Sequence, residues 1–93
     1  MDAKIYDMLV NQAKALVIRK GEDYNQSVDL HDYFPFGDMS YVQMLHMKVT
    51  RLRSLIAVTA NGGEPNFDSV LDTTLDLLNY TVFYLDYLKQ VDQ

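Results

Sequence analysis

The sequence predicts an all-α protein: one domain, residues 1–93, folded as a three-helix antiparallel bundle with a long aromatic loop between helices 1 and 2. Apolar residues recur every three or four positions in three separate segments, which is the period of an amphipathic helix. The first two segments end at Gly21 and at Asn61-Gly62-Gly63, and glycines of this kind are ordinary helix stops. A chain of 93 residues supports one modest core, in a size range where oligomerisation often adds stability.

The first helix is predicted over residues 2–20. Asp2 is a suitable N-cap, while Arg19 and Lys20 lie where positive charge interacts favourably with the helix dipole. Gly21 is expected to end the helix. One apolar face contains Ile5, Leu9, Ala13, Leu16 and Val17.

Residues 22–39 show no sustained periodicity, and Pro35 and Gly37 interrupt the later part. A connection of this length suggests a binding lid, an interface arm or a short extra helical turn. It is rich in aromatic side chains, which could close the end of the bundle or stack on a planar ligand. These residues are Tyr24, Tyr33, Phe34 and Phe36.

Ser40 is expected to open the second helix, because Gln43 three residues later completes a capping box. Lys48 lies at the edge of the apolar stripe of this helix, where burial of its charge requires a partner. Arg51 follows one turn later. The stripe itself contains Leu45, Val49, Leu52, Leu55 and Ile56.

The third helix is predicted over residues 68–91, with Asn66 or Asp68 as its cap. One stripe is expected to face the first two helices and contains Leu71, Leu75, Leu78, Val82 and Leu85. The opposite side is also apolar and contains Leu77, Tyr80, Tyr84, Tyr87 and Leu88. Because an exposed apolar face of this size is unusual, we expect the tyrosine side to form a homo-oligomer interface.

Composition excludes several classes of function. Hydrophobic residues make up 48% and charged residues 23% of the chain, which is typical of a globular domain. A net charge of −5 argues against general nucleic-acid binding or an anionic membrane surface. The chain has no cysteine, no apolar run long enough to span a membrane and no signal-peptide pattern. We therefore expect a cytoplasmic protein.

Two pairs of charged residues suggest a site between the second and third helices. Asp72 and Asp76 are four residues apart, so their carboxylates project from one helix face. Lys48 and Arg51 present two cations on one side of the second helix. These groups could form a structural ion-pair network, a site for an anion or nucleotide, or a catalytic Mg²⁺ site. His31, near Asp29 and Asp32, is interpreted as a solvated loop residue.

Three short motifs resemble a known family. They are Lys20-Gly-Glu-Asp23-Tyr24, Lys48-x-x-Arg51-Leu52-x-x-Leu55 and Asp72-x-x-x-Asp76-Leu77-x-Asn79-Tyr80. Together they resemble nucleotide modification associated domain 1, a phage-rich all-helical family similar to the MazG-type nucleoside triphosphate pyrophosphohydrolases. The resemblance covers residues 20–80. It implies a link to nucleotides and a phage or prophage setting. It also implies a shared groove lined by Lys20, Asp23, Tyr24, Lys48, Arg51, Asp72, Asp76 and Asn79.

The sequence departs from that pattern in two places. Asn25 stands where the family tends to have glycine, although asparagine also tolerates a left-handed backbone. In addition, the pyrophosphohydrolases pair acidic residues on two successive helices, whereas the second helix here offers Gln43, Met44, Met47 and Lys48. Exchanging carboxylates for cations favours direct phosphate binding over metal binding.

We therefore expect a small oligomeric protein that binds a nucleotide or another phosphate-bearing ligand, through Lys20, Asp23, Tyr24, Tyr33, Lys48, Arg51 and Asn79. Such a protein could sequester a nucleotide signal or act in nucleotide metabolism. No catalytic residue is assigned, and Asp72 and Asp76 are the candidate ligands for Mg²⁺. The alternatives are a Mg²⁺-dependent pyrophosphohydrolase of MazG type and a helical interaction module without a ligand.

Overall fold

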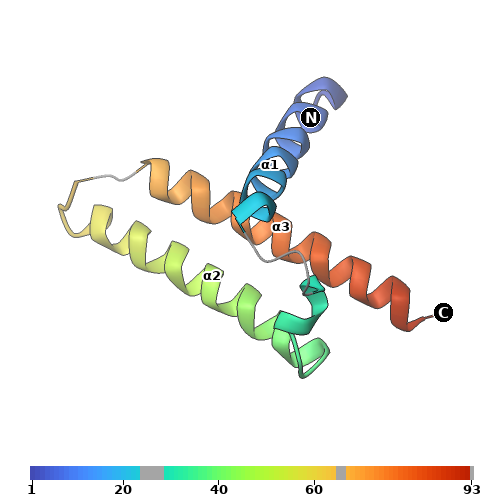
Figure 1. Cartoon of the computed structure of the whole chain (residues 1–93). Coiled ribbons are helices and arrows are strands. Elements are labelled where there is room, and N and C mark those ends of the chain that lie inside the picture. The colour runs from blue at the N-terminus through green and yellow to red at the C-terminus, as the bar shows by residue number, and fades with distance from the viewer. Residues whose placement is uncertain (24–28, 65–66, 93) are drawn as a thin grey trace.

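The structure is a computed structural model that describes residues 1–23, 29–64 and 67–92. Side chains are described except for those of residues 20–23 and 67–68. The described residues form three α-helices, α1 (Ala3–Asp23), α2 (Asp38–Ala60) and α3 (Phe67–Val91) (Figure 1). One 3₁₀ helix, η1 (Leu30–Tyr33), lies between α1 and α2. These ranges contain no strand, so the predicted all-α class is confirmed. None of the described helices is long and apolar enough to cross a membrane.

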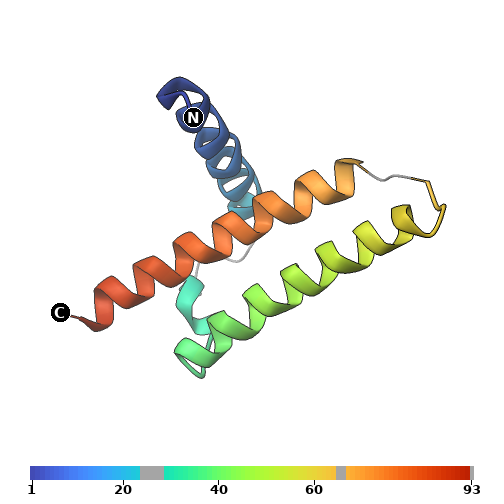
Figure 2. The ribbon, with the colours of Figure 1, turned by 180° about the vertical axis from the view of Figure 1, so that it is seen from behind.

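Helices α2 and α3 form an antiparallel hairpin and lie side by side along most of their length (Figures 1 and 2). The hairpin turn begins at Asn61, and Gly62 has a φ of 86°, a conformation that glycine adopts without a steric penalty. Helix α1 instead crosses α3, and its N-terminal half projects away from the hairpin. Most tertiary contacts therefore belong to the hairpin, with a smaller contact between α1 and α3.

The helix ends test the capping predictions. Asp2 caps α1 as predicted, because its Oδ1 accepts a hydrogen bond of 2.8 Å from the Lys4 N–H. The predicted stop at Gly21 is wrong, since the helix continues to Asp23. A single glycine costs a helix only about 1 kcal/mol, so it does not have to end one.

The prediction that Ser40 caps α2 is also wrong. The N-cap is Gly37, whose φ of 63° turns the chain sharply into a helix that begins at Asp38. Ser40 lies within the first turn, where its Oγ accepts a hydrogen bond of 2.9 Å from the Phe36 N–H. A side chain at Gly37 would also come within 2.7 Å of the Tyr87 hydroxyl, so glycine is required there by packing as well.

The side of α3 that is better covered within the chain is not the side predicted to form the core. The tyrosine side faces α2 and η1, because Tyr84 and Tyr87 lie 5.3 and 5.0 Å from the ring of Tyr41. The stripe expected to be the core is only partly covered: Leu75 and Leu78 are half-buried, while Val82 is 49% and Leu85 53% exposed. The prediction that the tyrosines form an outer surface is therefore wrong. Tyr41, 1% exposed, is instead the largest buried side chain among the described residues.

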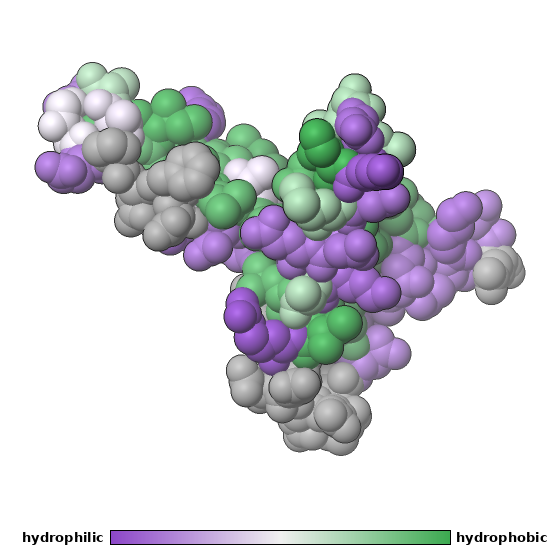
Figure 3. Space-filling model, turned by 90° about the horizontal axis from the view of Figure 1, so that it is seen from above, coloured by the Kyte–Doolittle hydropathy of each residue, from purple (hydrophilic) through white to green (hydrophobic). Residues whose placement is uncertain are grey.

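Little else is buried in the single chain. Ala13, Phe34 and Tyr41 are the buried hydrophobic residues, and Thr73 and Asn79 the buried polar ones, among those described. Ala13 marks the crossing of α1 over α3, where the Asn79 amide donates a hydrogen bond of 3.1 Å to the Ala13 carbonyl. Seen from above, hydrophobic side chains lie on the surface of α1 and along α3 (Figure 3).

Candidate anion-binding site

Lys48 and Asp76 meet between α2 and α3, as the spacing of the charged pairs predicts. The Lys48 Nζ lies 3.4 Å from Asp76 Oδ2, and both side chains are about four-fifths buried. The same Nζ lies 5.6 Å from the centre of the Tyr80 ring. The ammonium is therefore held by a carboxylate and by the face of an aromatic ring, which together satisfy a partly buried cation.

Arg51 lies one turn further along α2 and has a different environment. Its Nε donates a hydrogen bond of 3.1 Å to the hydroxyl of Thr73, which is buried on α3. This single contact fixes the direction of the guanidinium, while the residue as a whole remains exposed to solvent. The other guanidinium N–H groups make no further hydrogen bond within the described part of the chain, so they remain able to donate to a ligand.

These two cations border an open groove of about 660 Å³ on the surface of α2, here called the cationic groove. Its polar lining residues are a lysine, an arginine, a histidine, a threonine and a serine, and no acidic residue among those described lines it. Met44, Met47 and Leu55 supply the apolar part, and the polar lining is His46, Lys48, Thr50, Arg51 and Ser54. In a protein of net charge −5, this groove is a local site that favours an anion.

The carboxylates do not form a metal centre of their own. Asp76 contacts Lys48, and Asp72 lies one turn away with its side chain exposed. Among the described residues, no group of three or more His, Asp or Glu side chains is arranged to hold a metal ion. Mg²⁺ binding by Asp72 and Asp76 stays a prediction, and it requires ligand atoms from elsewhere, such as phosphate oxygens or water.

Two of the remaining predicted ligand residues, Asn79 and Tyr33, lie outside the residues that line the groove. Asn79 binds the Ala13 carbonyl at the contact between α1 and α3, away from the groove. Tyr33 lies in η1 with its side chain exposed. Lys20 and Asp23 belong to the last turns of α1, but their side chains lie outside the described residues, as does all of Tyr24.

The structure also contains a hydrogen-bonded chain that sequence reasoning missed. The interpretation of His31 as a solvated loop residue is wrong, because its ring bridges Tyr41 on α2 and Asp86 on α3. With His31 Nε2–H donating a hydrogen bond of 2.8 Å to Asp86 Oδ2, Nδ1 accepts a hydrogen bond from the Tyr41 hydroxyl. His31 and Asp86 are 55 residues apart, and no local pattern connects them.

Stacked rings surround this chain and form an aromatic cluster of Phe34, Tyr41, Tyr84 and Tyr87. Phe34 stacks on Tyr41 with centroids 4.2 Å apart, and Tyr84 stacks on its other side. Burial raises the pKa of the Tyr41 hydroxyl, and nearby Tyr87 and Asp86 add to the effect. The hydrogen bond from its hydroxyl to Asp38 raises the pKa of Tyr84. Both phenols are thus kept neutral, which suits a structural role.

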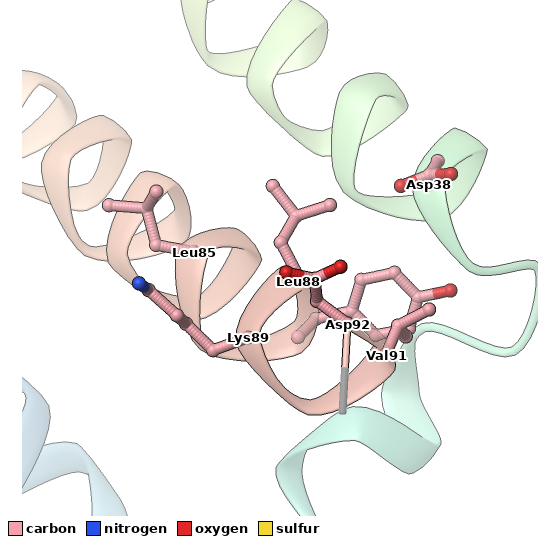
Figure 4. A pocket seen from close by; sticks show the side chains of 7 residues that line it. Asp38, Leu85, Leu88, Lys89, Val91 and Asp92 are labelled. Carbon is pink, nitrogen blue, oxygen red and sulfur yellow. The ribbon is translucent and has the colours of Figure 1, made fainter.

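A second cavity, of about 390 Å³, lies beside this cluster at the C-terminal end of α3 (Figure 4). Leu85, Leu88 and Val91 contribute its apolar wall, while its charged groups are Asp38, Lys89 and Asp92. Two carboxylates against one ammonium give this cavity no preference for an anion. The cationic groove is therefore the better candidate for a phosphate-bearing ligand.

Comparisons of the chain with known protein families, with characterised proteins and with solved structures find no match.

Proposed function

We propose that this chain is a small oligomeric binding protein whose cationic groove takes up a nucleotide or another phosphate-bearing small molecule. The observation that carries the proposal is the exposed Arg51, oriented by Thr73, in a groove that Lys48 also lines and that no acidic residue among those described lines. Paired cations and hydroxyl donors are the groups that bind phosphate oxygens most strongly. The motifs that resemble nucleotide modification associated domain 1 favour a nucleotide among such ligands.

The two cations are proposed to have different roles. Lys48 already has a carboxylate partner, so it supplies positive charge that is partly compensated by Asp76. Within the described part of the chain Arg51 has only a hydroxyl partner, so its guanidinium is the group that would contact phosphate directly. Thr50 and Ser54, which line the same groove, would add neutral donors to the ligand.

The test is isothermal titration calorimetry against a panel of nucleoside monophosphates, triphosphates and cyclic nucleotides. Removing a charge-assisted hydrogen bond costs roughly 1.5–3 kcal/mol, so Arg51→Ala should weaken the tightest interaction about tenfold to a hundredfold. Arg53→Ala is a matched control, because Arg53 is an exposed arginine on the same helix outside the groove lining. Its affinity should equal that of the parent.

Two results would contradict the proposal. One is that no phosphate-bearing compound binds more tightly than millimolar, and the other is that Arg51→Ala and Arg53→Ala bind equally well. Thermal unfolding of each variant separates loss of a ligand contact from loss of the fold. Release of pyrophosphate from a nucleoside triphosphate with Mg²⁺, abolished by Asp72→Asn, would instead assign the carboxylates to catalysis.

A further inference from the structure

The single chain exposes much more surface than a folded monomer of its mass. Its accessible area is 7324 Å², whereas a monomeric protein of 10.7 kDa exposes about 5,500 Å². Its radius of gyration is 15.2 Å, compared with about 12 Å for a compact domain of this length. The excess area of about 1,800 Å² is within the range that each subunit of an obligate dimer buries.

The uncovered apolar area lies on two helices that adjoin one another. The stripe of α3, formed by Leu71, Leu75, Leu78, Val82 and Leu85, has alternating spacings of four and three residues, the pattern by which one helix packs along another. The projecting half of α1 exposes Ile5 (48%), Leu9 and Val10, and nothing in the described part of the chain lies against its outer end. Figure 3 shows hydrophobic side chains on both helices on either side of their crossing.

An apolar hollow occupies the angle between these helices. It measures about 210 Å³ and is lined mainly by Val10 and Val17 of α1 and by Leu78, Val82 and Phe83 of α3. The α3 stripe therefore continues directly into the contact with α1. A helix from a second molecule packed on the stripe would bury its side chains next to those already in contact with α1.

The charges of the two helices favour pairing α1 of one molecule with α3 of another. Residues 3–19 carry three cations, Lys4, Lys14 and Arg19, against one carboxylate, Asp7. Residues 69–91 carry three carboxylates, Asp72, Asp76 and Asp86, against one cation, Lys89, but Asp76 and Asp86 already contact Lys48 and His31 of the same chain. The exposed Asp72, next to the α3 stripe, is better matched by the cations of α1 than by a second copy of α3.

We infer that two copies of this chain form a two-fold symmetric dimer in which α1 of each subunit covers the α3 stripe of the other. Each α3 then contacts three helices, namely α2 and α1 of its own subunit and α1 of the partner. This reciprocal contact uses the same surface twice, as a two-fold axis requires. The interface follows from exposed area and charge and does not use the cationic groove, so ligand binding at the groove and dimer formation can each fail without the other.

The experiment measures mass by sedimentation velocity and sedimentation equilibrium at micromolar protein. The parent should sediment as a dimer of the 10.7 kDa chain. Leu85→Glu or Ile5→Glu would bury an unpaired charge and should raise the dimer dissociation constant at least about a hundredfold. Val58→Glu is the matched control, because Val58 on α2 is 51% exposed and lies outside the α3 stripe. It should remain dimeric.

A cross-link identifies which helices meet, even if the glutamate variants do not fold. The chain has no cysteine, so Ile5→Cys and Leu85→Cys can be made in separate chains and mixed under oxidising conditions. A disulfide joining the two different chains is expected, at a higher yield than for Val58→Cys mixed with Leu85→Cys. A monomeric parent would overturn the inference, as would equal cross-linking of the two mixtures.

Discussion

The aromatic cluster and the cationic groove lie on the same helical hairpin, but their polar groups are used in opposite ways. At the cluster, Tyr41 is enclosed by rings, and its hydroxyl, His31 and Asp86 satisfy one another. At the groove, Thr73 holds one nitrogen of Arg51 while the rest of the guanidinium faces solvent. Groups that are already satisfied stabilise a fold, and only groups with unused donors can recognise a ligand.

The comparison also distinguishes two kinds of histidine. His31 is mostly buried and hydrogen-bonded on both ring nitrogens, whereas His46 is exposed at the rim of the groove. Substitutions in the aromatic cluster should therefore mainly lower the free energy of unfolding, and substitutions in the cationic groove should mainly weaken ligand binding. The following three predictions test that separation.

The largest effect on stability is expected for Tyr41→Ala. Removing a buried aromatic side chain from between two stacked rings should lower the free energy of unfolding by about 3–5 kcal/mol. Tyr41→Phe should lose much less, because the stacking remains and only the hydroxyl is removed. Urea denaturation followed by circular dichroism measures both. The separation of roles fails if Phe36→Ala, which removes an exposed ring, costs as much as Tyr41→Ala.

A smaller loss is expected for His31→Ala. It removes the group that joins Tyr41 to Asp86 and should cost about 1–3 kcal/mol, since the Tyr41 hydroxyl is left without its acceptor. His46→Ala should change the free energy of unfolding by less than about 0.5 kcal/mol. Equal losses in the two variants, measured by the same denaturation, would show that the hydrogen-bonded chain adds nothing.

The smallest effect is expected from alkaline pH. The pKa values of Tyr41 and Tyr84 are raised above 10.0 in the folded chain, so the unfolded chain releases these protons first. Stability is therefore unchanged by these groups below about pH 10 and falls as the pH rises through the raised pKa values. Thermal unfolding of Tyr84→Phe should show a shallower decline than the parent. A parallel decline would mean that Tyr84 does not contribute.

The sequence was sufficient for the features that depend on local pattern. The apolar period determined three helices, Asp2 was recognised as a cap, and the spacing of Lys48 and Asp76 on adjacent helices led to their pairing. These features depend on residues within a turn or two of one another, or on a simple antiparallel arrangement of two helices.

Only the tertiary structure decided which apolar side of α3 is covered. Both sides have a helical period, so periodicity cannot show which side is covered. The covered side is the one whose rings pack against Tyr41. The same packing brings His31 to Asp86 across 55 residues and places the N-cap of α2 at Gly37, so that the helix begins at Asp38. Contacts of this kind depend on the shapes of distant side chains, and no pattern within a single segment contains that information.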